Sequence, residues 1–217
     1  FGIVSLAGTG SIDYGLDRDG RAARAGGYGY LLADEGSGYW LGEQALRAAV
    51  KACDGRGPDT ELAPRIFKSL GIESVAELLP LVYEKEMPKY KIAALAPLVE
   101  QSRAAGDAVA GRIIEGAAAE LALGARSVAR QLGLGAEAFP VVLAGGVFRA
   151  CPTLPELVQE RLATIICLNV LEHVREDRLS LATLYRLVQP GGRLILLVPA
   201  LPAIYGTLDR ALASTRA

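Results

Sequence analysis

The first 25 residues alternate between apolar runs and short polar or glycine-rich breaks, a pattern typical of β-strands joined by turns. Phe1–Ala7 is an apolar run that ends at Gly8-Thr9-Gly10, and Ser11–Leu16 resumes with alternating side chains. Two strands around a glycine turn predict a β-hairpin. The polar stretch Asp17–Gly20 predicts a second turn, followed by a short strand at Arg21–Ala25.

The middle of the chain follows a helical pattern. A glycine-rich stretch, Gly26–Gly38, precedes a helix expected at Tyr39–Ala52. Asp59–Ala105 is expected to form several helices broken by prolines and a glycine. Asp107 is a good N-cap for a long alanine-rich helix that ends near Gly133, with one apolar face in the core.

The pattern then returns to β-structure. Pro140–Ala144 predicts a buried strand, Gly145-Gly146 breaks it, and Pro152 is expected to open the next helix in its N1 region. After Leu162 the chain changes character.

Two continuous apolar runs, Ala163–Val170 and Arg193–Val198, flank an amphipathic segment at Glu176–Val188. This order predicts a strand–helix–strand unit with parallel strands, which must be covered on both faces. We expect the unit to join the preceding sheet near Val141–Leu143 through a right-handed crossover.

Composition and charge exclude several classes of function. The net charge is −1 and the basic residues are scattered, so there is no electrostatic case for nucleic acid or an anionic membrane surface. The apolar run Leu194–Tyr205 is short and holds two prolines, so no membrane span is expected. Assembly into a homo-oligomer is left open.

Cysteine and histidine usage is equally restrictive. Three separated cysteines without a C-x-x-C pair argue against a disulfide framework or structural zinc, and favour a reducing cytoplasm. The lone His173 excludes a multi-histidine metal centre. The chain begins at Phe1 without a signal peptide, and reads as if cut from a longer sequence.

The most informative segment chemically is Leu6–Ser11. Its two glycines leave backbone N–H groups unobstructed, and Thr9 and Ser11 add hydroxyl donors, so the segment can form an anion-binding nest. No Gly-Lys-Ser/Thr follows, which excludes a Walker loop. A strand rather than a helix is expected next, which disfavours a Rossmann fingerprint. A plain hairpin turn is the alternative interpretation.

Three motifs in order resemble the BadF/BadG/BcrA/BcrD ATPase family, and within it the N-acetylglucosamine kinases of the actin/hexokinase superfamily. They are Gly8–Ser11, then Gly26–Gly29 leading into Asp34–Trp40, then Val141–Val147. The resemblance covers residues 3 to about 162. It implies an α/β fold, a ribonuclease H-like kinase lobe in which helices cover a mixed sheet.

The resemblance also implies ATP-dependent phosphorylation of an N-acetylated amino sugar, with Mg²⁺ as the metal. It assigns the ATP phosphates to Gly8, Thr9, Gly10 and Ser11, the adenosine to Gly145 and Gly146, and the sugar to Gly27, Tyr28 and Asp34. If the family resemblance is left aside, Asp34 is interpreted as an acid favoured at the start of a helix, and Gly145-Gly146 as a turn that ends a strand. The general base and the metal-linked aspartate are expected on a first lobe that no segment here resembles. No catalytic residue or metal ligand is therefore assigned, and the chain alone is expected to be inactive.

From about residue 164 to 212 the chain resembles the C-terminal part of class I S-adenosylmethionine-dependent methyltransferases, which have a Rossmann-like fold. The resemblance rests on Ile166–Val174, Leu184–Arg186, Pro190–Leu194 and Val198-Pro199. The glycine loop and ribose-binding acid of that family are absent, so we expect no S-adenosylmethionine binding. Glu172 and His173 are interpreted as structural.

The expected organisation is thus a kinase C-terminal lobe at 1–162 and a partial methyltransferase-like segment at 163–217. The alternatives to a sugar kinase are a methyltransferase fragment and a non-catalytic chimeric nucleotide-binding domain.

Overall fold

A mixed β-sheet organises the chain in the computed structural model, which describes residues 1–84, 87–134, 139–162, 164–168 and 193–197. Among these residues the sheet has the order β3-β2-β1-β4-β6-β5. Its strands are β1 (Gly2–Ala7), β2 (Ser11–Leu16), β3 (Ala22–Gly26), β4 (Pro140–Ala144), β5 (Thr164–Leu168) and β6 (Arg193–Leu197). The first three are antiparallel neighbours, whereas β4 runs parallel to β1.

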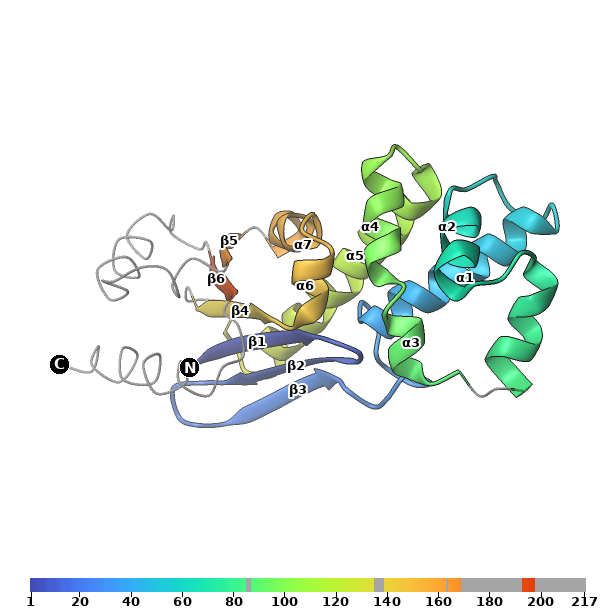
Figure 1. The fold of residues 1–217 in the computed structure, drawn as a ribbon. Helices are drawn as coiled ribbons and strands as arrows, with labels where there is room; N and C mark the ends of the chain where they lie inside the picture. Colours follow the sequence, from blue (N-terminus) through green and yellow to red (C-terminus); the bar gives the residue numbers. More distant parts are fainter. Residues whose placement is uncertain (85–86, 135–138, 163, 169–192, 198–217) are drawn as a thin grey trace, which may run out of the picture.

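The helices form a lobe at one end of the sheet and a layer on it (Figure 1). The lobe contains α1 (Gly38–Cys53), α2 (Leu62–Leu70), α3 (Lys89–Ala93) and α4 (Ala96–Ala104), with short helical segments at Val75–Glu77 and Pro80–Glu84. The long helix α5 (Ala108–Gln131) runs from this lobe along the sheet, and α6 (Gly146–Ala150) and α7 (Leu154–Leu162) follow β4. The expected α/β architecture, a mixed sheet with helices, is confirmed.

Apart from Ile3, the side chains that β1 and β2 bury on the α5 side of the sheet are small or polar. The buried positions of β1 are Ile3, Ser5 and Ala7, and those of β2 are Ser11, Asp13 and Gly15. Larger apolar residues point to the other face, where Leu6, Tyr14 and Leu16 are 40–44% exposed. Close packing explains this inversion: an added Cβ at Gly15 would lie 2.7 Å from Val128 Cγ1 of α5.

Asp13 is the unusual residue of this interface. Its carboxylate lies against Gly124 of α5, where an added Cβ would overlap it, and its Oδ1 has no hydrogen-bond partner among the described residues. Burial raises the pKa of Asp13 to about 7. The nearby Ser5 hydroxyl lowers this pKa, but its effect is smaller than that of burial. Ser5 Oγ is nonetheless not in hydrogen-bond geometry with Asp13. Burial therefore favours the neutral form of the Asp13 carboxyl in the folded protein.

The expected N-cap at Asp107 is confirmed. Asp107 Oδ1 accepts from Val109 N at 2.8 Å and Ala110 N at 3.0 Å, and Oδ2 accepts from Thr60 Oγ1 and Glu61 N, both at 2.6 Å. Burial alone raises the pKa of this carboxyl, but the hydrogen bonds outweigh burial and hold the pKa below its usual value. One carboxylate thus starts α5 and fixes the segment before α2.

One boundary prediction was wrong. Pro152 does not open a helix: it lies in a turn, and α7 begins at Leu154. The turn is held by tertiary contacts, since Thr153 Oγ1 donates to Glu100 Oε1 at 2.8 Å and Cys151 Sγ to Ala96 O at 3.6 Å. The short helix α6 was not predicted, because its opening glycines were interpreted as a break.

Prolines in the helical lobe also behave differently from the expectation. Pro64 lies within the first turn of α2 and Pro97 within that of α4. The first-turn amides of a helix need no intrahelical partner, so proline is tolerated there and does not break the helix.

The strands after residue 162 join the sheet as predicted. β6 pairs in parallel with β4, Val141 opposite Ile195, and β5 pairs in parallel with β6. The connecting helix, the handedness of the crossover and most of the methyltransferase-like motifs, including Glu172 and His173, lie outside the described residues.

Within the described part of the chain, no helix combines the length and hydropathy needed to cross a bilayer.

Candidate functional site

The β1–β2 turn is fixed by the start of α1. Gly38 N donates to Gly8 O at 2.8 Å and Tyr39 N to Thr9 O at 3.2 Å, while Gly8 N donates to Gly10 O at 2.8 Å. In a trans peptide the N–H points opposite to the C=O, so the amides of Thr9 and Gly10 point away from α1. Neither amide has a hydrogen-bond partner among the described residues. The turn therefore presents two free, oriented donors, as an anion nest requires.

Asp34 contacts this turn directly. Its Oδ1 accepts from Ser11 N at 3.3 Å, and the Ser11 hydroxyl donates to Glu35 O at 2.7 Å. An added Cβ at Gly10 would lie only 2.7 Å from Asp34 Oδ2. The structure thus brings together a predicted phosphate loop and a predicted sugar residue. The Ser11 amide and hydroxyl both donate hydrogen bonds within the protein, so the free amides of the turn are those of Thr9 and Gly10.

The segment before Asp34 is a compact glycine turn. Gly26 and Gly27 adopt positive φ values of 69° and 72°, and Gly27 N donates to Ala33 O at 2.9 Å. This bond places Gly27 beside the residue preceding Asp34. Tyr28 projects outward, 58% exposed, with the Arg24 guanidinium carbon 4.3 Å from its ring centroid. Tyr28 is therefore exposed to solvent and stacked with Arg24.

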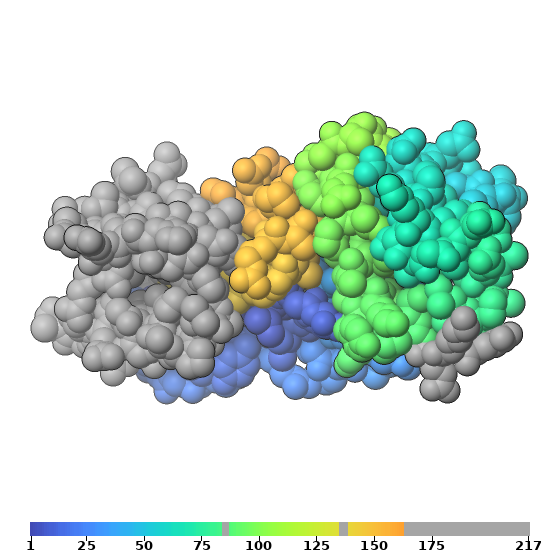
Figure 2. Space-filling model, in the orientation of Figure 1, coloured from blue at the N-terminus to red at the C-terminus, as the bar shows by residue number. Residues whose placement is uncertain are grey.

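The Gly145-Gly146 turn lies at the same edge of the sheet as the β1–β2 turn. Because β1 and β4 are parallel, with Leu6 opposite Ala144, their carboxyl ends meet there. Figure 2 shows the dark-blue end of the hairpin beside the gold residues of α6 and the green residues of α3 and α4. All predicted site residues except the outward Tyr28 side chain thus gather around one edge.

The two glycines of this turn serve different purposes. Gly145 has φ 115°, and an added Cβ would overlap the backbone carbonyl of Ala7. At Gly146 an added Cβ would meet no atom within 4 Å. Packing requires glycine at 145, whereas the space next to Gly146 is open.

Sequence reasoning missed the role of α1 in this site. The Ser37 hydroxyl caps the helix by accepting a hydrogen bond from Trp40 N at 3.2 Å. The amides of Gly38 and Tyr39, which follow Ser37, donate to the two carbonyls of the β1–β2 turn. The available signal was Asp34–Ser37 directly before the helix, a segment interpreted only as a helix entry and sugar contact.

Comparison with known proteins finds similarity to amino-sugar kinases. The chain is 40% identical over 146 residues to an N-acetylmuramic acid/N-acetylglucosamine kinase of Clostridium acetobutylicum, covering 67% of the chain and 48% of that relative. It is 35% identical over 164 residues to an N-acetyl-D-glucosamine kinase of Dictyostelium discoideum, covering 75% and 51%. The chain spans about half the length of the curated relatives it matches.

Solved structures show the same fold. A proposed N-acetylglucosamine kinase from Chromobacterium violaceum superposes with TM-score 0.60 at 34% identity, covering 74% of this chain and 53% of that one. A second, from Porphyromonas gingivalis, has TM-score 0.56 at 20% identity, covering 89% and 56%, and supports the fold alone.

The family match extends over residues 1–170, past the expected junction at 162. Of the two resemblances, the kinase one is confirmed, and the methyltransferase one finds no support in these relatives. The chain belongs to the BadF/BadG/BcrA/BcrD ATPase family.

Proposed function

We propose that this chain forms the nucleotide-holding half of an ATP-dependent kinase for N-acetylated amino sugars. The observation that carries the proposal is the meeting of two free amides, an open glycine turn and a loop-bound carboxylate at one edge of the sheet. The relatives named for N-acetylglucosamine and N-acetylmuramic acid kinases support the substrate class.

The free amides and the open space at this edge of the sheet would suit the phosphates and the adenosine of ATP. The Thr9 and Gly10 amides would donate to phosphate oxygens, where each charge-assisted hydrogen bond is stronger than a neutral one. The open space at Gly146 would admit the adenosine against the backbone. Gly8 and Ser11 would act by shaping the turn, and Gly145 by letting β4 and its turn approach β1.

The sugar would lie beside Asp34. A carboxylate accepts hydrogen bonds from two neighbouring hydroxyls at once, which suits a hexosamine ring. Asp34 Oδ1 already accepts from Ser11 N, so a sugar bound there would touch the same turn that holds the phosphates. Gly27 and Tyr28 would form the rim of this subsite.

Mg²⁺ would enter with the nucleotide. Among the described residues no group of three or more His, Cys, Asp or Glu side chains is placed to hold a metal ion. Mg²⁺ commonly keeps several waters and binds substrate phosphates with one or two carboxylates, and when bound it neutralises phosphate charge. Asp34 is the carboxylate that contacts the turn.

We predict that N-acetylglucosamine binds in the presence of Mg-ATP but is not phosphorylated. We assign no residue of this chain to the general base that the family resemblance implies, and such a base contributes about 10²–10⁴ in rate. Saturation-transfer NMR should detect sugar bound to the chain. Asp34→Asn should weaken the affinity for the sugar by about 10-fold, because charged hydrogen bonds are lost.

Glu35→Gln is the matched control, because the contact at residue 35 uses only its backbone carbonyl. If Asp34→Asn bound the sugar as tightly as the unchanged chain does, Asp34 would not be part of the sugar subsite. Sugar-dependent ADP release in a coupled assay would show that the chain is catalytically complete.

A further inference from the structure

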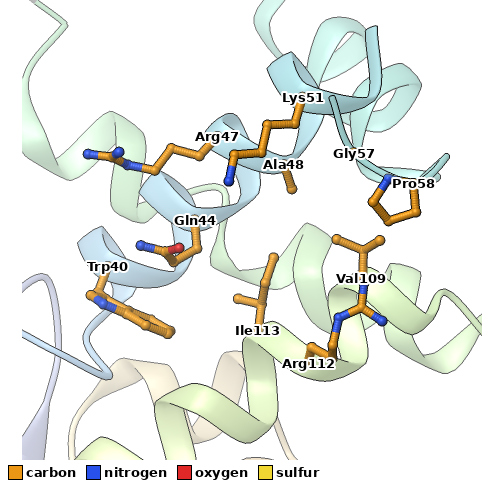
Figure 3. Close-up of a pocket in the computed structure, with 10 residues that line it drawn as sticks. All are labelled: Trp40, Gln44, Arg47, Ala48, Lys51, Gly57, Pro58, Val109, Arg112 and Ile113. Carbon is orange, nitrogen blue, oxygen red and sulfur yellow. The ribbon is translucent and has the colours of Figure 1, made fainter. Parts of the chain in front are cut away.

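A groove separate from the proposed nucleotide site runs between α1 and the first turns of α5 (Figure 3). It has a volume of about 350 Å³ and is lined by one face of α1, by Gly57-Pro58 and by residues 109–113 of α5. None of its lining residues belongs to the β1–β2 turn, to Asp34 or to Gly145-Gly146.

The floor of the groove is apolar and its position is fixed. Trp40 of α1 and Val109 and Ile113 of α5 line it, with Ile113 between the other two in Figure 3. The Trp40 ring rests on Gly116 of α5, where an added Cβ would lie 3.1 Å from Trp40 Cη2. A flat apolar group could pack against this indole.

The charged side chains of the groove all have the same sign. Arg47, Lys51 and Arg112 line it and no acidic side chain does, although the whole chain has a net charge of −1. Arg47 is paired with Glu43 at 2.9 Å. Lys51 and Arg112 form no ion pair among the described residues.

Asp54, an acid on which Lys51 acts electrostatically, is hydrogen-bonded to Arg56. Lys51 contributes to the lowered pKa of Asp54, but the first cause of that shift is the hydrogen bond from Arg56, whose Nη2 lies 2.6 Å from Asp54 Oδ2. The Lys51 ammonium thus remains available to a ligand.

We propose that this groove binds a small organic phosphate with a flat apolar body. The body would stack on Trp40 over the Val109–Ile113 floor. The phosphate would accept from the Arg112 guanidinium, whose planar fork suits two phosphate oxygens, and from the Lys51 ammonium. A cavity of this size with an apolar floor and a few convergent polar groups is typical of small-molecule sites.

The test uses phenyl phosphate as the probe and Trp40, the single tryptophan of the chain, as the reporter. Titration should change the Trp40 emission saturably, with a Kd on the order of 1 mM, because a ligand this small binds weakly. Phenol and inorganic phosphate, which each carry half of the recognised chemistry, should bind at least about 10-fold more weakly.

Variants locate the site. Lys51→Gln and Arg112→Gln should each weaken binding by about 3- to 10-fold, the usual effect of removing one charged hydrogen bond at an exposed site. Arg130→Gln, an exposed arginine at the other end of α5, should have no effect. Gly146→Val should also have none, which separates this groove from the nucleotide site.

Four results would overturn the proposal: no saturation, equal binding by inorganic phosphate, unchanged affinity in the Lys51→Gln/Arg112→Gln double variant, or loss of the signal in Gly146→Val. The last of these would assign the signal to the nucleotide site.

Discussion

Asp13→Asn is expected to remove most of the pH dependence of stability between pH 4 and 7. In the folded protein burial raises the pKa of Asp13 to about 7, above its value of 3.8 in the unfolded chain. Protonated Asp13 therefore stabilises the fold fully below pH 3.8, and this contribution is lost as the pH rises through 7. The difference between these two pKa values corresponds to about 4 kcal/mol in the free energy of unfolding.

The measurement is the free energy of unfolding in urea at several pH values for both proteins. Near pH 4 the two should be similar, because asparagine and a protonated aspartate have nearly the same shape. At pH 8 the variant should be more stable by up to about 4 kcal/mol. Parallel pH profiles would show that Asp13 does not titrate inside the α5 interface.

Gly145→Ala is expected to destabilise the fold by at least about 3 kcal/mol, because it combines backbone strain with steric overlap. Residue 145 has φ 115°, and its Cβ would overlap the Ala7 carbonyl on the neighbouring strand. Gly146→Ala is the matched control: no atom lies near its Cβ, so its change should stay within about 1 kcal/mol. Equal effects at the two positions in urea unfolding would contradict the close approach of β4 to β1.

Local sequence patterns predicted most of the elements. The Gly8-Thr9-Gly10 turn, the Asp107 cap and the β4 strand carry their information in a few neighbouring residues, and each formed as expected. The start of α7 was predicted too early because the contacts of Thr153 and Cys151 with α4 decide it, and these contacts are distant in sequence.

Burial of Asp13 could not be predicted from alternation. Ile12, Tyr14 and Leu16 are the more apolar face of β2, and the usual interpretation would bury them. The structure buries the opposite face, because α5 approaches the sheet closely at Gly15 and Gly124 and admits only small side chains. Only the pairing of glycines in distant segments could have indicated this.

The candidate site was predictable in its parts but not in their connections. The family motifs identified the turns at Gly8–Ser11 and Gly145-Gly146, and the parallel pairing of β1 and β4 brings them together. The bond from Ser11 N to Asp34 and the hold of α1 on the turn depend on the folded chain.

Mg-ATP titration by calorimetry of the chain, Gly146→Val and Gly111→Val tests the central claim most directly. Both glycines have open space at Cβ, so both variants should fold, but only residue 146 borders the proposed nucleotide. We predict saturable binding with a Kd on the order of 1 mM, unchanged in Gly111→Val and at least about 10-fold weaker in Gly146→Val. Absence of ATP binding, or equal affinity in all three proteins, would contradict a nucleotide site at this edge of the sheet.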